Sequence, residues 1–195
     1  MSLTVINYGG GNIKSVRNML ESLNQEYIVS SKPEDILNSD KLILPGQGHF
    51  GQVMQSLKET GLDNAIIQRI NEGAKFLGIC VGIQILFEES EEAPDIKGLG
   101  ILKGKVLKFT EGKVPQIGWN MLKTTQNNSY LSDEYVYFVN SYYVKPNDES
   151  VVSAYSSYHI DFPASVEYKN VAAFQFHPEK SGEVGYSFIK KWLEN

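Results

Sequence analysis

The 195-residue chain contains a single cysteine, so it has neither an internal disulfide nor a zinc site built from several cysteines. It also lacks an excess of positive charge: its formal net charge is -5, which argues against binding to a nucleic-acid backbone. No apolar stretch approaches the roughly 20 residues that a membrane-spanning helix requires, and the opening MSLTVINYGGGN lacks the charged segment of a signal peptide. We therefore expect a cytoplasmic protein without a bound metal or other cofactor, whose one thiol requires its own explanation.

The chain does contain enough apolar material for one compact domain over residues 1–195, since 42% of its residues are hydrophobic and 11% aromatic. In the first half, strand patterns alternate with helix patterns. Strands are expected at 3–8, 25–30, 41–45 and 75–79. Helices are expected after the capping residue Asn12, over about 52–72 with a break near Gly61, and over 81–90. This alternation predicts a parallel sheet with helices on both faces.

The second half is rich in β-forming residues and has few helix patterns before its end. Strands are expected within 100–109, 136–144, 150–158 and 171–176, and a closing helix over about 184–193. We interpret these strands as antiparallel additions to the sheet, one of which returns to its centre. The predicted fold class is therefore α/β: a flavodoxin-like, doubly wound, mostly parallel sheet with antiparallel additions.

The one cysteine, Cys80, lies in the stretch FLGICVGIQILF, between a strand expected to end at Ile79 and a helix expected to begin at Val81. Gly78 and Gly82 flank it in a Gly-x-Cys-x-Gly pattern, which is typical of a nucleophile elbow. Such a turn projects the side chain from the carboxyl edge of the sheet, and the positive end of the following helix favours the thiolate. The alternative is that Cys80 is a small buried hydrophobic residue, as most free cysteines are.

A candidate base follows the last expected strand, in the stretch AAFQFHPEKS. His177 would reach the same sheet edge as Cys80, and a turn at Pro178 would let Glu179 fold back onto the imidazole ring. A carboxylate on one ring nitrogen would direct the other nitrogen toward the sulfur, in a triad of nucleophile, base and orienter. The alternative is a surface turn in which this His-Pro-Glu sequence is incidental.

The other histidines and one glycine-rich turn are weaker signals. His49 has no carboxylate close to it in the sequence, and His159 is expected within a strand. Gly46, Gln47 and Gly48 follow the third expected strand, where glycines allow backbone N–H groups to point into a site, as an oxyanion hole requires. A single Gly-x-Gly pattern is common in ordinary turns, so it gains weight only beside the elbow.

Three motifs in this order, PGQG, GICVGIQ and FQFHPEKS, resemble the signatures of class I, or triad-type, glutamine amidotransferases, and the resemblance extends over nearly the whole chain. It implies that Cys80 is the nucleophile, His177 the acid and base, Glu179 its orienter, and the loop from Gly46 to Gly48 the oxyanion site. The residues that it implies for binding the substrate glutamine are Gln84, Glu92, Asn140, Ser141 and Tyr142. The charge of Glu92 suits the ammonium group of glutamine, although this residue lies in an acidic run and could equally face solvent.

Within this family, NYGGGNIKSV, IGWN and FVNSYYV resemble the glutaminase subunits of imidazole glycerol phosphate synthase, an enzyme of histidine biosynthesis. Such a subunit passes ammonia to a (β/α)8-barrel cyclase subunit, its partner in a heterodimer, which makes imidazole glycerol phosphate and AICAR from PRFAR. The residues that the resemblance implies for the docking face and ammonia gate are Asn12, Trp119, Asn120, Tyr137 and Lys180. Trp119 could equally be an ordinary core residue. The chain departs from many members at Gln116 and Asn140, where histidine is frequent, and both departures are expected near the docking face.

Three other functions are compatible with the sequence. A related subunit could supply ammonia to a sugar-amidating enzyme. A thiol hydrolase of similar fold would share the elbow but would require neither Gln84 four residues after Cys80 nor the His-Pro-Glu motif. A non-catalytic flavodoxin-like binding module could use Gly9 to Gly11 for a phosphate, but the chain has no complete dinucleotide-binding or P-loop motif.

Overall fold

The computed structural model describes residues 1–195, and its centre is one eight-stranded sheet. In spatial order the strands are β2 (Ile28–Ser30), β1 (Leu3–Ile6), β3 (Lys41–Leu44), β4 (Lys75–Ile79), β13 (Val171–Phe174), β12 (Ile160–Tyr168), β11 (Val152–Tyr158) and β8 (Lys123–Thr124). Neighbours from β2 to β13 are parallel, and neighbours from β13 to β8 are antiparallel. The expected return of one strand to the centre is confirmed, because β13 lies between β4 and β12.

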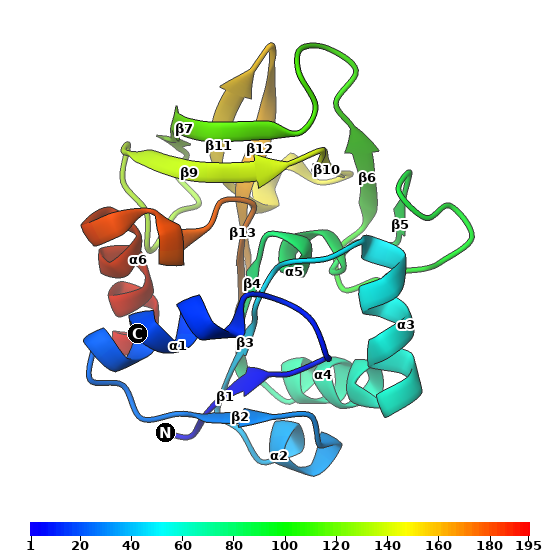
Figure 1. Cartoon of the computed structure of the whole chain (residues 1–195), viewed down its shortest axis with the longest axis vertical. Coiled ribbons are helices and arrows are strands. Elements are labelled where there is room, and N and C mark those ends of the chain that lie inside the picture. Colours follow the sequence, from blue (N-terminus) through cyan, green and yellow to red (C-terminus); the bar gives the residue numbers. More distant parts are fainter.

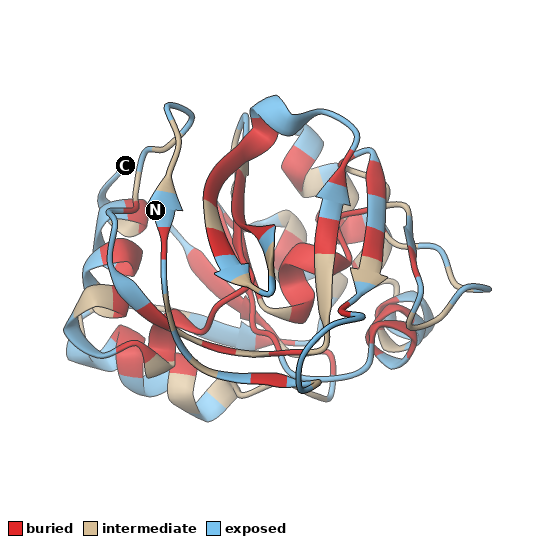
Figure 2. Cartoon of the chain, turned by 90° about the horizontal axis from the view of Figure 1, so that it is seen from above, coloured by how far each residue is buried: buried red, intermediate tan, exposed pale blue.

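Helices cover both faces of this sheet, as the alternation of strands and helices predicts (Figure 1). They are α1 (Ile13–Ser22), α2 (Pro33–Leu37), α3 (Phe50–Thr60), α4 (Leu62–Asn71), α5 (Val81–Gln84) and α6 (Gly182–Glu194). Alternate residues of a strand face opposite layers: Leu42 and Leu44 pack with α3 and α4, whereas Ile43 packs with α1 and α6. In Figure 2 the helices accordingly carry buried residues on one side and exposed residues on the other. None of the helices combines the length and apolarity needed to cross a bilayer.

Four strands of the second half lie outside the main sheet, so the expectation that all of them extend it is wrong. β10 (Tyr142–Pro146) pairs with β6 (Gly104–Lys108), which also pairs with the short β5 (Glu89–Ser90). β7 (Gln116–Met121) and β9 (Tyr135–Asn140) form a separate two-stranded ribbon above the carboxyl ends of the parallel strands (Figure 1). β12, β11 and β8 occupy the positions beyond β13, and these four strands pair with one another and with β5 instead.

Two further expectations about local structure differ from the fold. The helix expected over 81–90 ends at Gln84, because residues further along the chain take the carbonyl groups that a longer helix would use. Leu99 N donates to Ile85 O at 2.7 Å, and Leu102 N donates to Leu86 O at 2.9 Å. His159 is not within a strand but at the turn between β11 and β12, with φ 59. By contrast, the expected break at Gly61 is confirmed, since this residue separates α3 from α4 with φ 72.

Candidate active site

Cys80 occupies a strained turn between β4 and α5. Its φ of 51 and ψ of -105 lie outside the common regions for a residue with a side chain, a conformation that costs about 1–3 kcal/mol and is concentrated at functional sites. The flanking glycines are required by close packing, since a Cβ on Gly78 would lie 2.5 Å from the carbonyl oxygen of Gly82. The expected elbow is therefore present, but the positive φ falls on the cysteine rather than on the glycines. Cys80 N donates to Phe174 O at 2.7 Å, which joins the turn to β13.

His177 reaches Cys80 because β13, which precedes it, pairs directly with β4. The expected turn after it is a short 3-10 turn at Pro178–Lys180, which folds Glu179 back onto the ring. His177 Nδ1 and Glu179 Oε1 are 2.8 Å apart, and both side chains are 1% exposed. Hydrogen bonds also fix the backbone of His177. Its N–H donates to Tyr137 O at 2.9 Å, and Ser181 Oγ donates to its carbonyl oxygen at 2.7 Å.

The surroundings of His177 favour its charged form. Burial alone would lower the pKa of the ring, but the hydrogen bond to Cys80 and the charge of Cys80, followed by those of Glu179, outweigh burial and raise the pKa to about 10. The ring therefore holds its proton near neutral pH, between a carboxylate and a sulfur. This arrangement can deliver a thiolate nucleophile together with a proton donor on the same side of the sheet.

Removal of the sulfur is expected to lower the pKa of His177, because in Cys80→Ala burial still opposes the charged ring and only Glu179 remains to favour it. Nitrogen-15 NMR titration of the imidazole in both proteins measures this change. Since the pKa of about 10 exceeds the ordinary 6.5, the charged ring contributes its full stabilisation below pH 6.5 and loses it as the pH rises through about 10. A ring that titrates near pH 6.5 in the wild-type protein would contradict the pairing.

A cavity of about 250 Å³ opens beside the sulfur. Its walls are formed by residues from five different segments of the chain: Gly48, Cys80, Val81, Gln84, Glu92, Pro115, Val139, Asn140, Ser141 and Tyr142. At about 30 Å³ per water molecule, this volume suits a ligand with roughly the size of one amino acid. A larger hollow of about 770 Å³ lies at the opposite end of the sheet, around Met1 and Tyr27, and contains no cysteine or histidine, so volume alone does not identify the reactive site.

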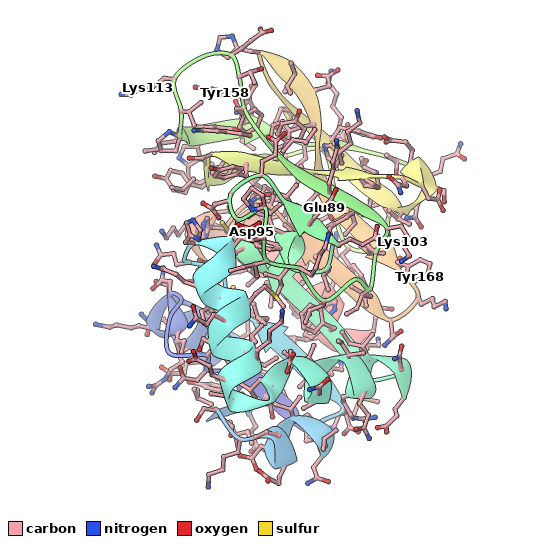
Figure 3. All side chains as sticks on the ribbon, turned by 90° about the vertical axis from the view of Figure 1, so that its right-hand side faces the viewer. Glu89, Asp95, Lys103, Lys113, Tyr158 and Tyr168 are labelled. Carbon is pink, nitrogen blue, oxygen red and sulfur yellow. The ribbon has the colours of Figure 1, made fainter.

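Glu92 provides the one carboxylate in the cavity wall. Its Oε2 accepts a hydrogen bond from Phe50 N, the first residue of α3, at 2.6 Å. The other acidic residues of the run have different partners: Glu88 pairs with Lys103 at 2.8 Å and Glu89 with Lys97 at 3.1 Å. Glu89 and Lys103 are labelled in Figure 3, on the face that also carries α3. A ligand with a positive group would find its counter-charge at Glu92.

The loop at Gly46 to Gly48 lies directly on the elbow. A Cβ on Gly46 would be 1.7 Å from Ile79 O, so this position admits only glycine without a shift of the backbone. Gly48 lines the cavity, whereas Gln47 does not. Tyr8 tethers the loop, because its hydroxyl lies 3.0 Å from Pro45 O and 2.8 Å from Gln47 O. Burial is the main reason why the pKa of Tyr8 is raised to about 12, so the hydroxyl stays a donor.

Two of the residues expected at a docking face, Trp119 and Tyr137, belong to an apolar surface on the β7–β9 ribbon. Trp119 and Tyr137 are cross-strand partners on the β7–β9 ribbon, with ring centroids 5.8 Å apart. Trp119 is 52% exposed, which excludes the alternative of a core residue. Ile117 and Tyr135 extend this apolar surface and are 63% and 56% exposed. Asn120 is half-buried and follows Trp119 on β7.

Two other residues expected at the docking face lie at the start of α1 and in the turn that follows His177. Asn12 caps α1 by accepting a hydrogen bond from Ser15 N at 3.4 Å. Lys180 ends the 3-10 turn that α1 contacts, and its N–H donates to His177 O at 3.0 Å. Both residues are half-buried. The backbone at Lys180 is therefore bound directly to the residue that pairs with the sulfur.

Gln116 and Asn140 lie on the β7–β9 ribbon, near the expected docking face but not on its outer surface. They are cross-strand partners on the inner face of the ribbon, 1% and 5% exposed, because side chains alternate along β7 and the outward positions belong to Ile117 and Trp119. Neither amide atom of Gln116 has a hydrogen-bond partner in the protein.

Several residues that contact the site were missed by the sequence analysis. Gln175 is fully buried, and its Nε2 lies 3.8 Å from the Cys80 sulfur. Val139 O lies 3.8 Å from the same sulfur. One signal for Gln175 was present, because it precedes His177 by two residues on an extended segment, where alternate side chains share a side. His49, which was a weaker candidate base, caps α3 through its Nδ1, which accepts from Gly51 N at 3.1 Å.

Comparison with known proteins assigns this arrangement to a family. The family model for class-I glutamine amidotransferases matches residues 4–194. Subunit HisH 1 of imidazole glycerol phosphate synthase from Methanococcus maripaludis is 42% identical over 200 residues, which cover 98% of both chains. The chloroplastic hisHF form of that synthase from Arabidopsis thaliana is 43% identical over 98% of this chain and 34% of its own length.

Solved structures agree on the fold. A crystal structure described as a glutamine amidotransferase superimposes with a TM-score of 0.81 at 23% identity, covering 100% of this chain and 98% of the other. The α/β fold with its mixed sheet is therefore that of known glutamine amidotransferases. The chain belongs to the class-I glutamine amidotransferase family, as a relative of the HisH subunits of imidazole glycerol phosphate synthase.

Proposed function

We propose that this chain is the glutaminase subunit of imidazole glycerol phosphate synthase and releases ammonia from glutamine for a cyclase subunit. The observation that carries the proposal is that Cys80 contacts His177, whose Nδ1 lies 2.8 Å from the buried Glu179 Oε1, beside a cavity with one carboxylate. The family and the HisH relatives supply the reaction class and the pathway of histidine biosynthesis. Cys80 and His177 supply a chemical route for the hydrolysis of glutamine.

In this route, the thiolate of Cys80 attacks the side-chain amide carbon of glutamine, and the carbonyl π electrons move to oxygen. Backbone N–H groups of the loop from Gly46 to Gly48 stabilise the resulting oxyanion. His177 gives its proton to the amide nitrogen, the C–N bond breaks, and ammonia leaves behind a glutamyl thioester. The neutral ring then takes a proton from water, whose oxygen attacks the thioester. Glutamate is released, and the thiolate and the protonated ring are restored.

The cavity wall offers a group for each polar end of glutamine. Glu92 is the counter-charge for the ammonium group. Gln84, one turn beyond Cys80, lies in the same wall and presents an amide. Asn140, Ser141 and Tyr142 form another part of the cavity wall. Their roles in binding are part of the proposal and follow from position and charge.

The proposed partner follows from the chemistry of ammonia and from the exposed ribbon. Ammonia is protonated in bulk water, so the acceptor must dock close to Cys80. The outer face of the β7–β9 ribbon, with Ile117, Trp119 and Tyr135, is apolar and lies above the strand end that carries Cys80 (Figure 1). In the chloroplastic hisHF synthase from Arabidopsis thaliana, the region similar to this chain is 34% of a longer polypeptide, which leaves room for a partner domain in the same chain. A cyclase on this ribbon would receive ammonia without release to solvent.

Replacement of Trp119 by alanine is expected to weaken binding of the cyclase by about 2 kcal/mol or more, roughly 30-fold in Kd, because large exposed aromatic residues dominate interface energies. Isothermal titration calorimetry of the two purified subunits measures the change. Tyr168→Ala is the matched control, since Tyr168 is also exposed, at 37%, but lies on β12 rather than on the ribbon (Figure 3). An unchanged Kd for Trp119→Ala would remove the ribbon from the interface.

The experiment that tests the function measures glutamate release from glutamine by the chain alone and with a histidine-pathway cyclase, together with glutamine-dependent turnover of PRFAR. We expect low release alone and a strong increase in the complex. Failure of the cyclase to bind or to respond would favour the supply of ammonia to a sugar-amidating enzyme. Release that is equally fast without any partner would favour an independent thiol hydrolase.

A further inference from the structure

Gln175 is a buried polar residue to which the mechanism above gives no role. It lies between the end of β13 and His177, and none of its surface is exposed. Its backbone N–H donates to Ala164 O at 2.8 Å, so the segment continues the pairing with β12 and its position is fixed. The side chain therefore enters the core beside Cys80 from a rigid part of the sheet.

The orientation of the Gln175 amide is set by its neighbour. Gln84 Nε2 donates to Gln175 Oε1 at 3.2 Å, which leaves Gln175 Nε2 facing the Cys80 sulfur at 3.8 Å. If the amide of Gln175 were reversed, two NH2 groups would face each other and an oxygen would face the sulfur. The hydrogen-bond network thus selects the orientation in which Gln175 is a donor to sulfur.

The same network continues into the cavity wall. Gln84 Nε2 also donates to Tyr142 O at 3.3 Å, and Asn140 Nδ2 donates to that oxygen at 3.0 Å. Gln84, Asn140 and Tyr142 all line the cavity, whereas Gln175 lies behind it. Gln175 is thus the connection between one wall of the cavity and the reactive sulfur.

The sulfur has different partners in its two protonation states. A neutral thiol can donate to Val139 O, which lies 3.8 Å away. A thiolate cannot donate and is repelled by a carbonyl oxygen, but it accepts from Gln175 Nε2 and from the charged ring of His177. The Gln175 amide therefore acts on the charged state of the sulfur in particular.

We propose that Gln175 is a positioning residue, whose amide donates to the Cys80 thiolate and holds it against His177 and toward the cavity. Its own amide is held in turn by Gln84. The predicted effect on glutamine hydrolysis rests on the proposed function. The hydrogen bond from Gln175 to the sulfur does not. Two donors from different directions, an amide and an imidazolium, leave the thiolate one lone-pair direction for the substrate.

The first test is the rate at which iodoacetamide, a small neutral electrophile, alkylates Cys80 at pH 7. We compare the wild-type chain with Gln175→Met, which removes the donor, and Gln175→Glu, which keeps the shape but places an oxygen toward the sulfur. We expect alkylation to slow by about 10- to 100-fold in Gln175→Met, the range for a hydrogen bond to a charged group, and further in Gln175→Glu. Gln116→Met is the matched control: Gln116 is equally buried, does not line the cavity and makes no hydrogen bond to the network, so the rate should stay unchanged.

The second test separates positioning of sulfur from packing and from substrate binding. In the complex with the cyclase, Gln175→Met should lower kcat for glutamine by about 10-fold or more with little change in KM. Gln84→Met should reduce the alkylation rate, and the double variant should be no slower than Gln175→Met alone, because both act through one hydrogen-bonded chain. Circular dichroism confirms folding of each variant.

Three results would overturn the inference: wild-type alkylation in both Gln175 variants, equal slowing by Met and Glu, or an effect on KM alone. Because alkylation requires no glutamine, its outcome is independent of the proposed function. A wild-type complex that fails to hydrolyse glutamine would remove the proposed function, and the alkylation series would still decide the role of Gln175.

Discussion

Cys80→Ala is expected to abolish glutamate release from glutamine, by at least about 10⁴-fold, because the mechanism depends on the one thiol in the cavity wall. In the same complex, cyclase turnover supplied with an ammonium salt is expected to continue at its wild-type rate, since the docking ribbon does not include this side chain. The fold should persist. Alanine in place of cysteine accepts the same φ of 51 at a similar cost, and one lost sulfur leaves only a small cavity.

Two assays on one preparation decide this prediction: glutamate release and ammonium-dependent cyclase turnover. His159→Asn is a suitable control for substitution of a polar residue far from the site, because His159 lies at the β11–β12 turn with φ 59 and asparagine tolerates this region. The turn can be found in Figure 3 from the label of the preceding residue, Tyr158, whose hydroxyl donates to Lys113 O at 2.6 Å. Glutamine hydrolysis close to the wild-type rate in Cys80→Ala would eliminate the covalent mechanism.

Gly46→Ala is expected to have the second-largest effect, although it adds only a methyl group. The new Cβ would lie 1.7 Å from Ile79 O and 2.7 Å from Cys80 Cβ, so either the loop or the elbow must move. Overpacking of this kind costs about 1–3 kcal/mol in the free energy of unfolding. A displacement of about 1 Å at the reacting atoms costs roughly 100-fold in rate, so we expect at least that loss of glutaminase activity.

Thermal unfolding and glutaminase assays measure the two effects of Gly46→Ala. The control is Gly73→Ala, whose φ of 99 strains any other residue but whose Cβ would meet no atom within 4 Å. This control should lose about 1–3 kcal/mol of stability without loss of activity. If Gly46→Ala kept wild-type activity at any cost in stability, the loop would not control the geometry of the nucleophile.

The sequence was informative wherever structure depends on neighbours along the chain. The Gly-x-Cys-x-Gly pattern identified the turn at Cys80, and the His-Pro-Glu pattern identified the turn that returns Glu179 to His177. The buried parallel strands β3 and β4 were readable as short apolar runs. The break at Gly61 was readable from one glycine within a helical pattern.

Prediction failed where pairing between distant segments overrides local preference. Residues 85–90 have a helical pattern, yet the carbonyl oxygens of Ile85 and Leu86 accept hydrogen bonds from the backbone N–H groups of Leu99 and Leu102. The contact of Gln175 with sulfur depends on Gln84 and on the register of β13 with β4, which no local pattern specifies. Similarly, alternation along β7 decides that Trp119 faces outward and Gln116 inward, and this follows only once the strand is known to be part of a ribbon.

The insertion of β13 between β4 and β12 has a consequence for synthesis of the protein. Until Val171 and its neighbours leave the ribosome, β4 is an edge strand with unpaired backbone groups, and Cys80 has no imidazole beside it. A nascent or truncated polypeptide is therefore inert toward glutamine but prone to self-association through that open edge. On the proposed mechanism, hydrolysis of glutamine thus begins only after β13 has paired with β4 and has brought His177 to Cys80.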